Sequence, residues 1–322
     1  MFTNILVGVD GRPSGRDAIA LARQLGTPGG RITLAHIYGG AWILSGAASR
    51  ALASGRKRSA ELLGRERAAV SVEARLISQP ARSVGRGLHE LAERNQADLL
   101  VVGSRGRSLV ERVLTGDHTI ASLNGARCAV AIAPNGYRRR TDRFAKIGVG
   151  HNGTPESEQA LRAARGLAAR HRSEITAIAV VSLQSMPKGE PIPVDWTQIT
   201  EQLLWEERRR LASLEDVEGD VRYGDPSEEL AQIGEGLDLL VVGSRSYGPV
   251  DRLFIGSTSN YLARHTPCPL LVLPRVLLER GDHASTEAIT RRPAPPITVF
   301  HPPWETRPRG SCGDLRALRS NY

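Results

Sequence analysis

The sequence predicts an α/β protein made of two tandem, doubly wound domains, each with a five-stranded parallel sheet, followed by a C-terminal tail. An internal repeat is the first observation: Asp98-Leu-Leu-Val-Val-Gly-Ser-Arg105 recurs from Asp238 to Arg245, and residues 98–134 align with 238–274 without a gap. The second is that short apolar runs alternate with segments of helical periodicity. The third is that only 4% of residues are aromatic, so aliphatic side chains must fill the cores, as in buried parallel strands.

In the first half, five apolar runs predict the strands. The first covers residues 2–9 and ends at Asp10 and Gly11. A helix is expected from Ser14, because Ser14 and Asp17 have the spacing of a capping box. The other expected strands are residues 31–38, 70–77, 99–102 and 129–133, and the other expected helices are residues 56–69, 84–92 and a short one after Gly116.

The second half follows the same plan. Residues 144–151 match residues 2–9, and Asn152 stands where Asp10 stood. Thr154 and Pro155 predict a helix start, since proline is favoured at the first helical position. The further expected strands are residues 175–181, 221–223, 239–242 and 270–273, with a long helix over residues 195–214 and a capped helix after Asp225.

These elements give domains at residues 1–136 and 144–275, a linker at residues 137–143, and a tail at residues 276–322. The tail is rich in proline and arginine and has no hydrophobic periodicity, so we expect it to be disordered or loosely attached. The formal net charge is +9, and its arginines include residues 138, 139, 140 and 143 in the linker and more in the tail. No basic stretch is interleaved with aromatic residues, which disfavours nucleic-acid binding.

Cysteine and histidine spacing predicts neither a metal site nor a disulfide framework. Cys128 and Cys268 occupy equivalent repeat positions, and we expect small buried core residues in a reducing cytoplasm. His118 and His265 are expected at the surface or as helix caps. No apolar run reaches the roughly 18 residues of a membrane span, and no charged region precedes the N-terminal apolar run, as a signal peptide requires. No Gly-x-Ser-x-Gly elbow is present, so no catalytic residue is predicted.

The spacing Gly103-x2-Gly106-x9-Gly116 is typical of an anion site. Glycines let the backbone turn tightly and approach a ligand, and a helix starting near Gly116 presents free N–H groups to an anion. If strands one and four are neighbours, Asp10 faces this loop, where a carboxylate can bond a base or ribose. Glycines after strands are also common as simple turns, so both interpretations stay open at this point.

Several segments together carry a family resemblance: Val7-Gly-Val-Asp10, Ala35-His-Ile37, Ala97-Asp-Leu-Leu-Val-Val-Gly-Ser-Arg-Gly106, Cys128-Ala-Val-Ala-Ile-Ala-Pro134 and Cys268-Pro-Leu-Leu-Val-Leu-Pro274. Through them the chain resembles the universal stress protein family in its tandem form, over about residues 1–275. The resemblance implies a Rossmann-like fold akin to the adenine-nucleotide hydrolases, dimer-type pairing through strand five, and a regulatory rather than metabolic role. Nucleotide-binding members hold ATP phosphates with Gly-x2-Gly-x9-Gly-(Ser/Thr), while an Asp after strand one and the backbone of strand two meet the adenosine.

The resemblance transfers to both halves, each with departures. The first half matches at Gly8, Val9, Asp10, Ile37, Val102, Gly103, Arg105, Gly106 and Gly116. It departs at Asp117, where a carboxylate replaces a hydroxyl and repels a phosphate. The second half matches at Asn152, Val180, Gly243, Arg245, Gly256, Ser257 and Thr258. It departs at Ser246, in place of the second glycine, although Gly248 can serve the turn, and at Asn152, which carries an amide.

The expected function is a cytoplasmic stress-response regulator that binds ATP, with or without Mg, at the carboxyl ends of strands one and four, preferably in the second domain. It is not expected to be an enzyme beyond weak ATP hydrolysis. The expected partners are an adenine nucleotide, a second copy or an intrachain pseudo-dimer, and an unknown regulatory protein. Two alternatives stay open: a nucleotide-free dimerisation or docking scaffold, favoured by Asp117 and Ser246, and an enzyme of the related hydrolase group.

Overall fold

The computed structural model of the chain describes residues 2–39, 46–70, 73–104, 125–140, 143–182, 196–244 and 256–274. All of these residues belong to one compact unit, Met1–Leu277. The elements of the first half are β1 (Phe2–Gly8), α1 (Pro13–Leu25), β2 (Gly26–Gly39), α2 (Gly46–Val70), β3 (Arg75–Ala81), α3 (Val84–Arg94), β4 (Leu99–Gly103), β5 (Ala129–Ala133) and the 3-10 turn η1 (Tyr137–Arg139).

The second half repeats this succession. Its elements are β6 (Lys146–Gly150), α6 (Pro155–His171), β7 (Glu174–Val181), α7 (Trp196–Ala212), β8 (Glu218–Tyr223), α8 (Pro226–Ile233), the 3-10 turn η3 (Gly234–Gly236), β9 (Leu239–Gly243), α9 (Ser257–His265) and β10 (Leu270–Leu273).

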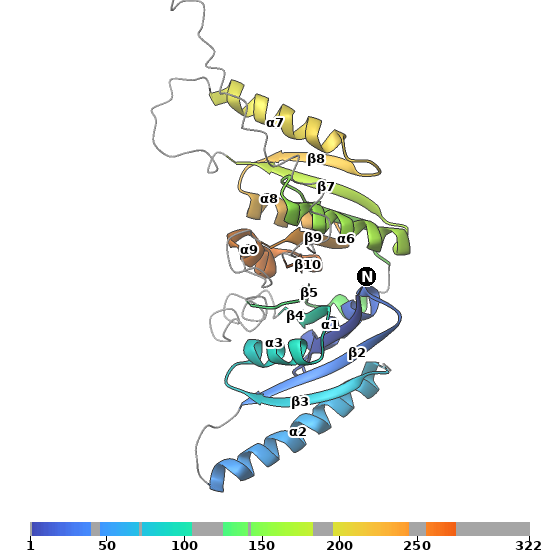
Figure 1. Cartoon of the computed structure of the whole chain (residues 1–322), viewed down its shortest axis with the longest axis vertical. Helices are drawn as coiled ribbons and strands as arrows, with labels where there is room; N and C mark the ends of the chain where they lie inside the picture. The colour runs from blue at the N-terminus through green and yellow to red at the C-terminus, as the bar shows by residue number, and fades with distance from the viewer. Residues whose placement is uncertain are drawn as a thin grey trace, which may run out of the picture. The chain divides into compact units, whose positions relative to one another are not determined.

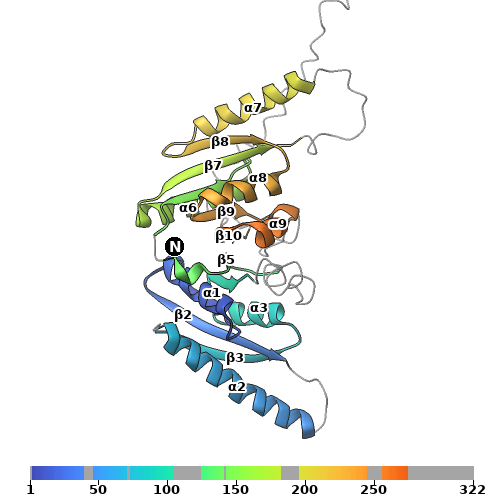
Figure 2. The same cartoon turned by 180° about the vertical axis from the view of Figure 1, so that it is seen from behind.

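The described strands form one ten-stranded sheet in the order β3-β2-β1-β4-β5-β10-β9-β6-β7-β8 (Figure 1). Within each half all five strands are parallel, which confirms the predicted fold class. The two halves meet through β5 and β10, which pair antiparallel with Leu271 opposite Ala131. Figure 2 shows the same order from behind, with α2 beside β3 and α7 beside β8 at the two ends of the sheet.

Both faces of the sheet are covered, and alternate strand residues point to different helices. Leu99 and Val101 pack in one core with α1, α2 and α6, whereas Leu100 and Val102 pack in a second core with α3, α8 and α9. Because a central strand is buried on both sides, its sequence is a continuous apolar run rather than an alternating one. This explains why Leu-Leu-Val-Val could be identified as a strand in both repeats.

Two of the three predicted helix starts are confirmed, and one is wrong. Thr154 caps α6 by accepting from the Ser157 N–H, and Asp225 caps α8 by accepting from the Ser227 N–H, a bond that lowers the pKa of Asp225. α1 instead begins at Pro13, and its first turn has no side-chain cap, so the predicted capping box of Ser14 and Asp17 does not form.

Asp17 is instead fully buried beneath the segment that follows β5. Its carboxylate accepts from the backbone N–H of Gly136 at 2.9 Å and of Arg138 at 2.8 Å, and from the Arg138 guanidinium at 3.1 Å. Tyr137 is also buried and donates its hydroxyl to Gln24 in α1. The start of the proposed linker is therefore packed on the first domain, and the exact domain boundaries stay a proposal.

The two outer strands of the first half, β2 and the edge strand β3, depart from the predicted bounds. β2 begins five residues before the predicted start, because Gly26 already pairs with Phe2 before an irregularity in the register. β3 begins at Arg75 rather than residue 70, since α2 continues through Val70. Pro80 lies in β3, an outermost strand of the sheet, where its missing N–H leaves no ladder bond unmade.

The two described cysteines are buried, as predicted. Burial raises the pKa of Cys128 to about 12 and that of Cys268 to about 11, so both thiols are unreactive core residues. Within the described ranges no helix combines the length and apolar character needed to cross a membrane. The predicted tail, with Cys312, lies outside the described residues, as does His118.

Candidate functional site

The acidic residue that opens each repeat motif is a strand anchor at the amino ends of the strands. Asp98 accepts from the backbone N–H of Thr3 at 2.7 Å, and Asp238 accepts from those of Ala145 and Lys146 at 2.8 and 2.9 Å. Each carboxylate ties the start of β4 or β9 to the start of β1 or β6. The repeated aspartate is thus explained by sheet assembly, and the candidate site lies at the opposite, carboxyl ends of these strands.

At those carboxyl ends, Asp10 and Asn152 form equivalent turns. Asp10 Oδ1 accepts from the Arg12 N–H at 3.1 Å, and Asn152 Oδ1 accepts from the Thr154 N–H at 3.4 Å and its hydroxyl at 2.7 Å. The glycine between has φ of +77° at Gly11 and +75° at Gly153, a conformation that glycine adopts without strain. Each turn is therefore stabilised by hydrogen bonds to its own Asp10 or Asn152 side chain, without a ligand.

The first glycine of each phosphate-loop motif is required by helix packing. A Cβ built on Gly243 would lie 2.7 Å from the backbone carbonyl carbon and oxygen of Glu156, in the first turn of α6. Gly103 is crowded in the same way by the backbone of Ser14 in α1. The sequence interpretation attributed these glycines to ligand approach. The neighbouring helix fills the space of their missing side chains, and their predicted role in binding a nucleotide stays a prediction.

Strand adjacency brings the predicted residues together in two groups. β1 pairs with β4 and β6 with β9, so Asp10 and Gly103 end at one edge, and Asn152 and Gly243 at the equivalent edge. The side chain of Ile37 lies in the core that includes α3 and α8, and that of Val180 packs against it.

The α9 helix begins at Ser257, within the second predicted phosphate-loop motif. Gly256 precedes it with an ordinary negative φ of −75°, Ser257 is exposed and Thr258 is half-buried. No side chain caps this helix. Arg105, Gly106, Gly116, Asp117, Arg245 and Ser246 lie outside the described residues, so the interior of both predicted phosphate loops is not described.

Comparison with known proteins settles the family. The universal stress protein family model matches residues 1–134 and again residues 143–274. The chain belongs to the universal stress protein family. It is 30% identical over 236 residues to a universal stress protein of Mycobacterium tuberculosis, an alignment that covers 70% of this chain and 80% of that protein. The two family matches also confirm the predicted tandem form.

Solved universal stress proteins share the architecture of the whole described unit. A universal stress protein from Archaeoglobus fulgidus aligns with a TM-score of 0.59 and 17% identity, covering 85% of this chain and 98% of that one. A putative universal stress protein from Pseudomonas aeruginosa aligns with a TM-score of 0.54 and 16% identity, covering 85% and 93%. At these identities the likeness establishes the fold alone. Members of this family are stress-response proteins.

In this universal stress protein, two features of the second site were missed by sequence reasoning. His151, only 3% exposed, contacts Glu158 and Arg210 directly before Asn152. Ser244, also 3% exposed, follows Gly243, and within the described ranges its hydroxyl has no hydrogen-bond partner. The repeat offered a signal for the first, because Val9 in the first half aligns with His151. The repeat offered no signal for Ser244, because Ser104 stands at the equivalent position of the first half.

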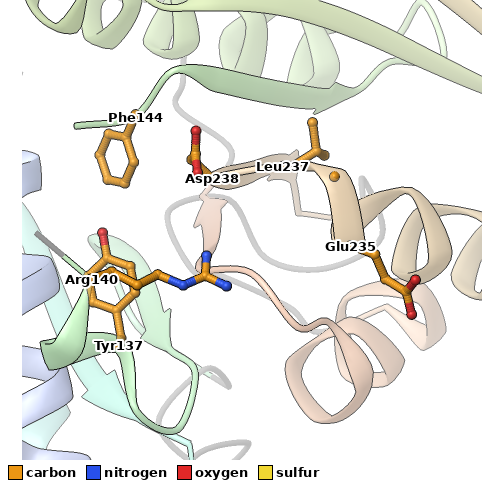
Figure 3. A pocket seen from close by; sticks show the side chains of 7 residues that line it. Tyr137, Arg140, Phe144, Glu235, Leu237 and Asp238 are labelled. Atoms are coloured by element: carbon orange, nitrogen blue, oxygen red, sulfur yellow. The ribbon is translucent and has the colours of Figure 1, made fainter. Parts of the chain in front are cut away.

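The other cavities and clusters lie elsewhere. Over the described residues, no group of three His, Cys, Asp or Glu side chains is placed to hold a metal. A pocket of about 290 Å³ lies at the amino end of β9, lined by Tyr137, Arg140, Phe144, Glu235, Gly236, Leu237 and Asp238. Figure 3 shows Arg140 reaching into it from the η1 side, with Leu237 and Asp238 on the β9 side. It includes none of the predicted site residues. His265 lies exposed at the end of α9 and donates to the Tyr261 carbonyl, as expected of a surface histidine.

Proposed function

We propose that this universal stress protein is a cytoplasmic stress-response regulator that binds ATP in its second domain, at the carboxyl ends of β6 and β9. Family membership supports an adenine nucleotide, because some members bind such ligands. The topology supports the location, because Asn152 and Gly243 end neighbouring strands at one edge of a parallel sheet, where ligands of such sheets bind. The buried free thiols of Cys128 and Cys268 fit a reducing compartment.

The observation that carries this proposal is the Ser244 hydroxyl. It is buried at the carboxyl end of β9, and its oxygen has no hydrogen-bond partner among the residues that the structure describes. Leaving a buried polar group unpaired costs about 1–3 kcal/mol, so each such group in a native protein calls for an explanation. A phosphate oxygen at this corner would supply the missing acceptor. The equivalent Ser104 of the first domain is only half-buried.

Charge supports the second domain over the first. Ser257 presents a hydroxyl at the start of α9, where the backbone N–H groups favour an anion. The first repeat has Asp117 at the equivalent position. At an effective dielectric near 20, a like-charge contact at about 4 Å costs roughly 4 kcal/mol before screening, and a quarter of that lowers affinity about fivefold.

A serine–histidine contact that could suit hydrolysis is closed to substrates, and this favours a regulatory role. Ser59 in α2 lies 2.6 Å from Nδ1 of His36 in β2, a distance that could suit nucleophile activation. Ser59 is only 1% exposed, however, so a substrate cannot reach its hydroxyl. Burial also lowers the pKa of His36, and the nearby Asp10 charge opposes that shift. We infer that the pair holds α2 against β2.

The alternative is a nucleotide-free scaffold, and one observation favours it. Gly103 and Gly243 are explained by helix packing, and the Asp10 and Asn152 turns are satisfied internally. These four positions would therefore be retained by the fold even if both pockets had lost their ligand. The intrachain pairing of β5 with β10 would then provide the docking platform.

Two serine substitutions distinguish the functions. Native mass spectrometry of the purified chain should detect a bound adenine nucleotide, and calorimetry should show Ser257→Asp weakening ATP binding about fivefold or more. Ser257→Asn, matched in size but uncharged, is the control and should bind nearly as the wild type does. Ser244→Ala should weaken ATP binding without destabilising the nucleotide-free protein, since the hydroxyl has no partner to lose. Unchanged ATP affinity in both Ser257→Asp and Ser244→Ala would exclude this site.

A further inference from the structure

An ionisable cluster around the buried His151 lies directly before Asn152 in the second domain. His151 ends the β6 segment, and its Nε2 lies 2.9 Å from Glu158 Oε1 in α6. Its Nδ1 is contacted by a guanidinium nitrogen of Arg210 in α7, and Arg210 also donates to the His151 carbonyl oxygen at 3.1 Å. The same guanidinium is paired with Glu207. Arg210 therefore contacts both the ring and the backbone carbonyl oxygen of His151.

These contacts fix the protonation state in which the cluster can form. A guanidinium only donates hydrogen bonds, so Nδ1 must be the unprotonated nitrogen that accepts from Arg210. The ring proton of neutral His151 then lies on Nε2 and is donated to Glu158. Adding a second proton would place an N–H on Nδ1 facing the N–H of Arg210. Two hydrogen-bond donors would then face each other, and Arg210 would have to move away from the ring.

Arg210 also lies over the turn that presents Asn152. A Cβ built on Gly153 would lie 3.5 Å from Nη1 and 3.6 Å from Nε of Arg210, so the guanidinium contacts the turn itself. Displacing Arg210 would remove the cover of Gly153 and the bond to the His151 carbonyl oxygen. Asn152 lies between these two points of contact.

The first domain has the same turn without the ionisable cluster. Val9 replaces His151, and Gly11 lies under the apolar side chain of Leu62, 2.9 Å from a Cβ built on it. Arg16, at the position of Glu158, instead pairs with Glu66 in α2 at 3.0 Å. One chain therefore contains two versions of one turn, one preceded by a buried histidine and the other by a valine.

We propose that His151 and Arg210 are positioning residues that hold the Asn152–Gly153 turn only while His151 is neutral, so that the second site loses ATP affinity on acidification. The loss of ATP affinity rests on the proposed function. The groups facing His151 are Glu158 from α6 and Arg210 and Glu207 from α7.

The direction of the pH effect follows from these groups. Burial is the largest influence and lowers the pKa of His151 below its ordinary value, and Arg210 lowers it further, while Glu158 and Glu207 oppose the shift. A histidine with a lowered pKa contributes its full stabilising effect above the ordinary value of about 6.5. That effect is lost as the pH falls through the lowered pKa. The turn should therefore be held at neutral pH and released in mild acid.

The first test follows backbone amide resonances of the full chain by NMR between about pH 7.5 and about pH 5. The Asn152 and Gly153 amides should shift together with the His151 ring, whereas the Gly11 amide should not follow that transition. His151→Asn keeps an acceptor oxygen for Arg210 but cannot titrate, so it should abolish the transition at Asn152 and Gly153. Arg210→Gln, at a partly exposed helix position, is the second variant and should raise the His151 pKa. Amides that ignore His151, or that still titrate in His151→Asn, would overturn the proposal.

The second test compares ATP affinity at about pH 7.5 and about pH 5.5 by calorimetry. The wild type should lose about fivefold or more in affinity relative to His151→Asn, whose binding reports the titration of ATP itself. Equal pH dependence in both proteins would refute the positioning role while leaving the proposed function intact. Absence of ATP binding at every pH would refute the proposed function, and the amide measurement would still decide whether His151 controls the turn.

Discussion

Replacing Gly243 by alanine should separate the demands of the fold from those of a ligand. The added Cβ would lie 2.7 Å from the backbone carbonyl of Glu156 and 2.8 Å from its Cβ. Real Cβ atoms do not approach this closely, and a backbone carbonyl in the first turn of α6 cannot rotate away as a side chain could. The helix or the strand must therefore shift.

The expected cost is at the upper end of the range for overpacking, about 3 kcal/mol, because the obstacle is main chain. Gly166→Ala is the matched control. Gly166 lies within α6, and nothing lies within 4 Å of a Cβ built on it. There the same chemical change should stabilise by about 0.5–1 kcal/mol through helix propensity. One additional methyl group should thus destabilise at the crowded strand end and stabilise at the open helix position.

Urea unfolding of the nucleotide-free protein, followed by circular dichroism, measures both effects. With a slope of about 2–3 kcal/mol per molar urea, Gly243→Ala should lower the midpoint by about 1 M and Gly166→Ala should raise it slightly. If Gly243→Ala unfolds within about 0.5 kcal/mol of the wild type, the contact with Glu156 does not explain the glycine, and ligand approach becomes the better explanation.

Two further predictions concern stability. Asp17→Asn should cost about 3 kcal/mol or more, because a buried carboxylate with three donors loses its charge and turns an NH₂ group toward a donor. The exposed Asp216→Asn, in a left-handed turn that asparagine tolerates, should be nearly neutral in the same urea assay. Deleting residues 281–322 should leave the melting temperature nearly unchanged, and a drop of several degrees, equivalent to about 1 kcal/mol or more, would show that the tail packs on the domains.

The sequence predicts the strands at the centre of the sheet better than β2 and β3 at its outer end. β5 and β10 were predicted to the residue, because strands buried on both faces are short apolar runs with abrupt ends. β2 and β3 were misplaced by about five residues. Their ends are set by pairing partners, such as Gly26 with Phe2, and an exposed strand end has no apolar signal of its own.

The candidate site was predictable where it depends on local sequence and not where it depends on distant contacts. The Asp10 and Asn152 turns follow from an acidic or amide residue before glycine at a strand end. The contact of Arg210 with His151 joins residues 59 positions apart, and no periodicity in α7 indicates this contact. Glycine spacing alone also cannot distinguish a ligand from a neighbouring helix as the reason for Gly243.

The intrachain pairing of β5 with β10 explains why the two sites could diverge. β5 is hydrogen-bonded to β4 on one edge and β10 on the other, so the strand through which the family resemblance implied dimer pairing is already occupied. In a symmetric homodimer every substitution appears twice, and a buried histidine introduced at one turn would enter both. Fusion of the two copies removes that constraint. The chain can then hold one turn with Leu62 and the other with Arg210, giving two related turns of which only one follows a buried histidine.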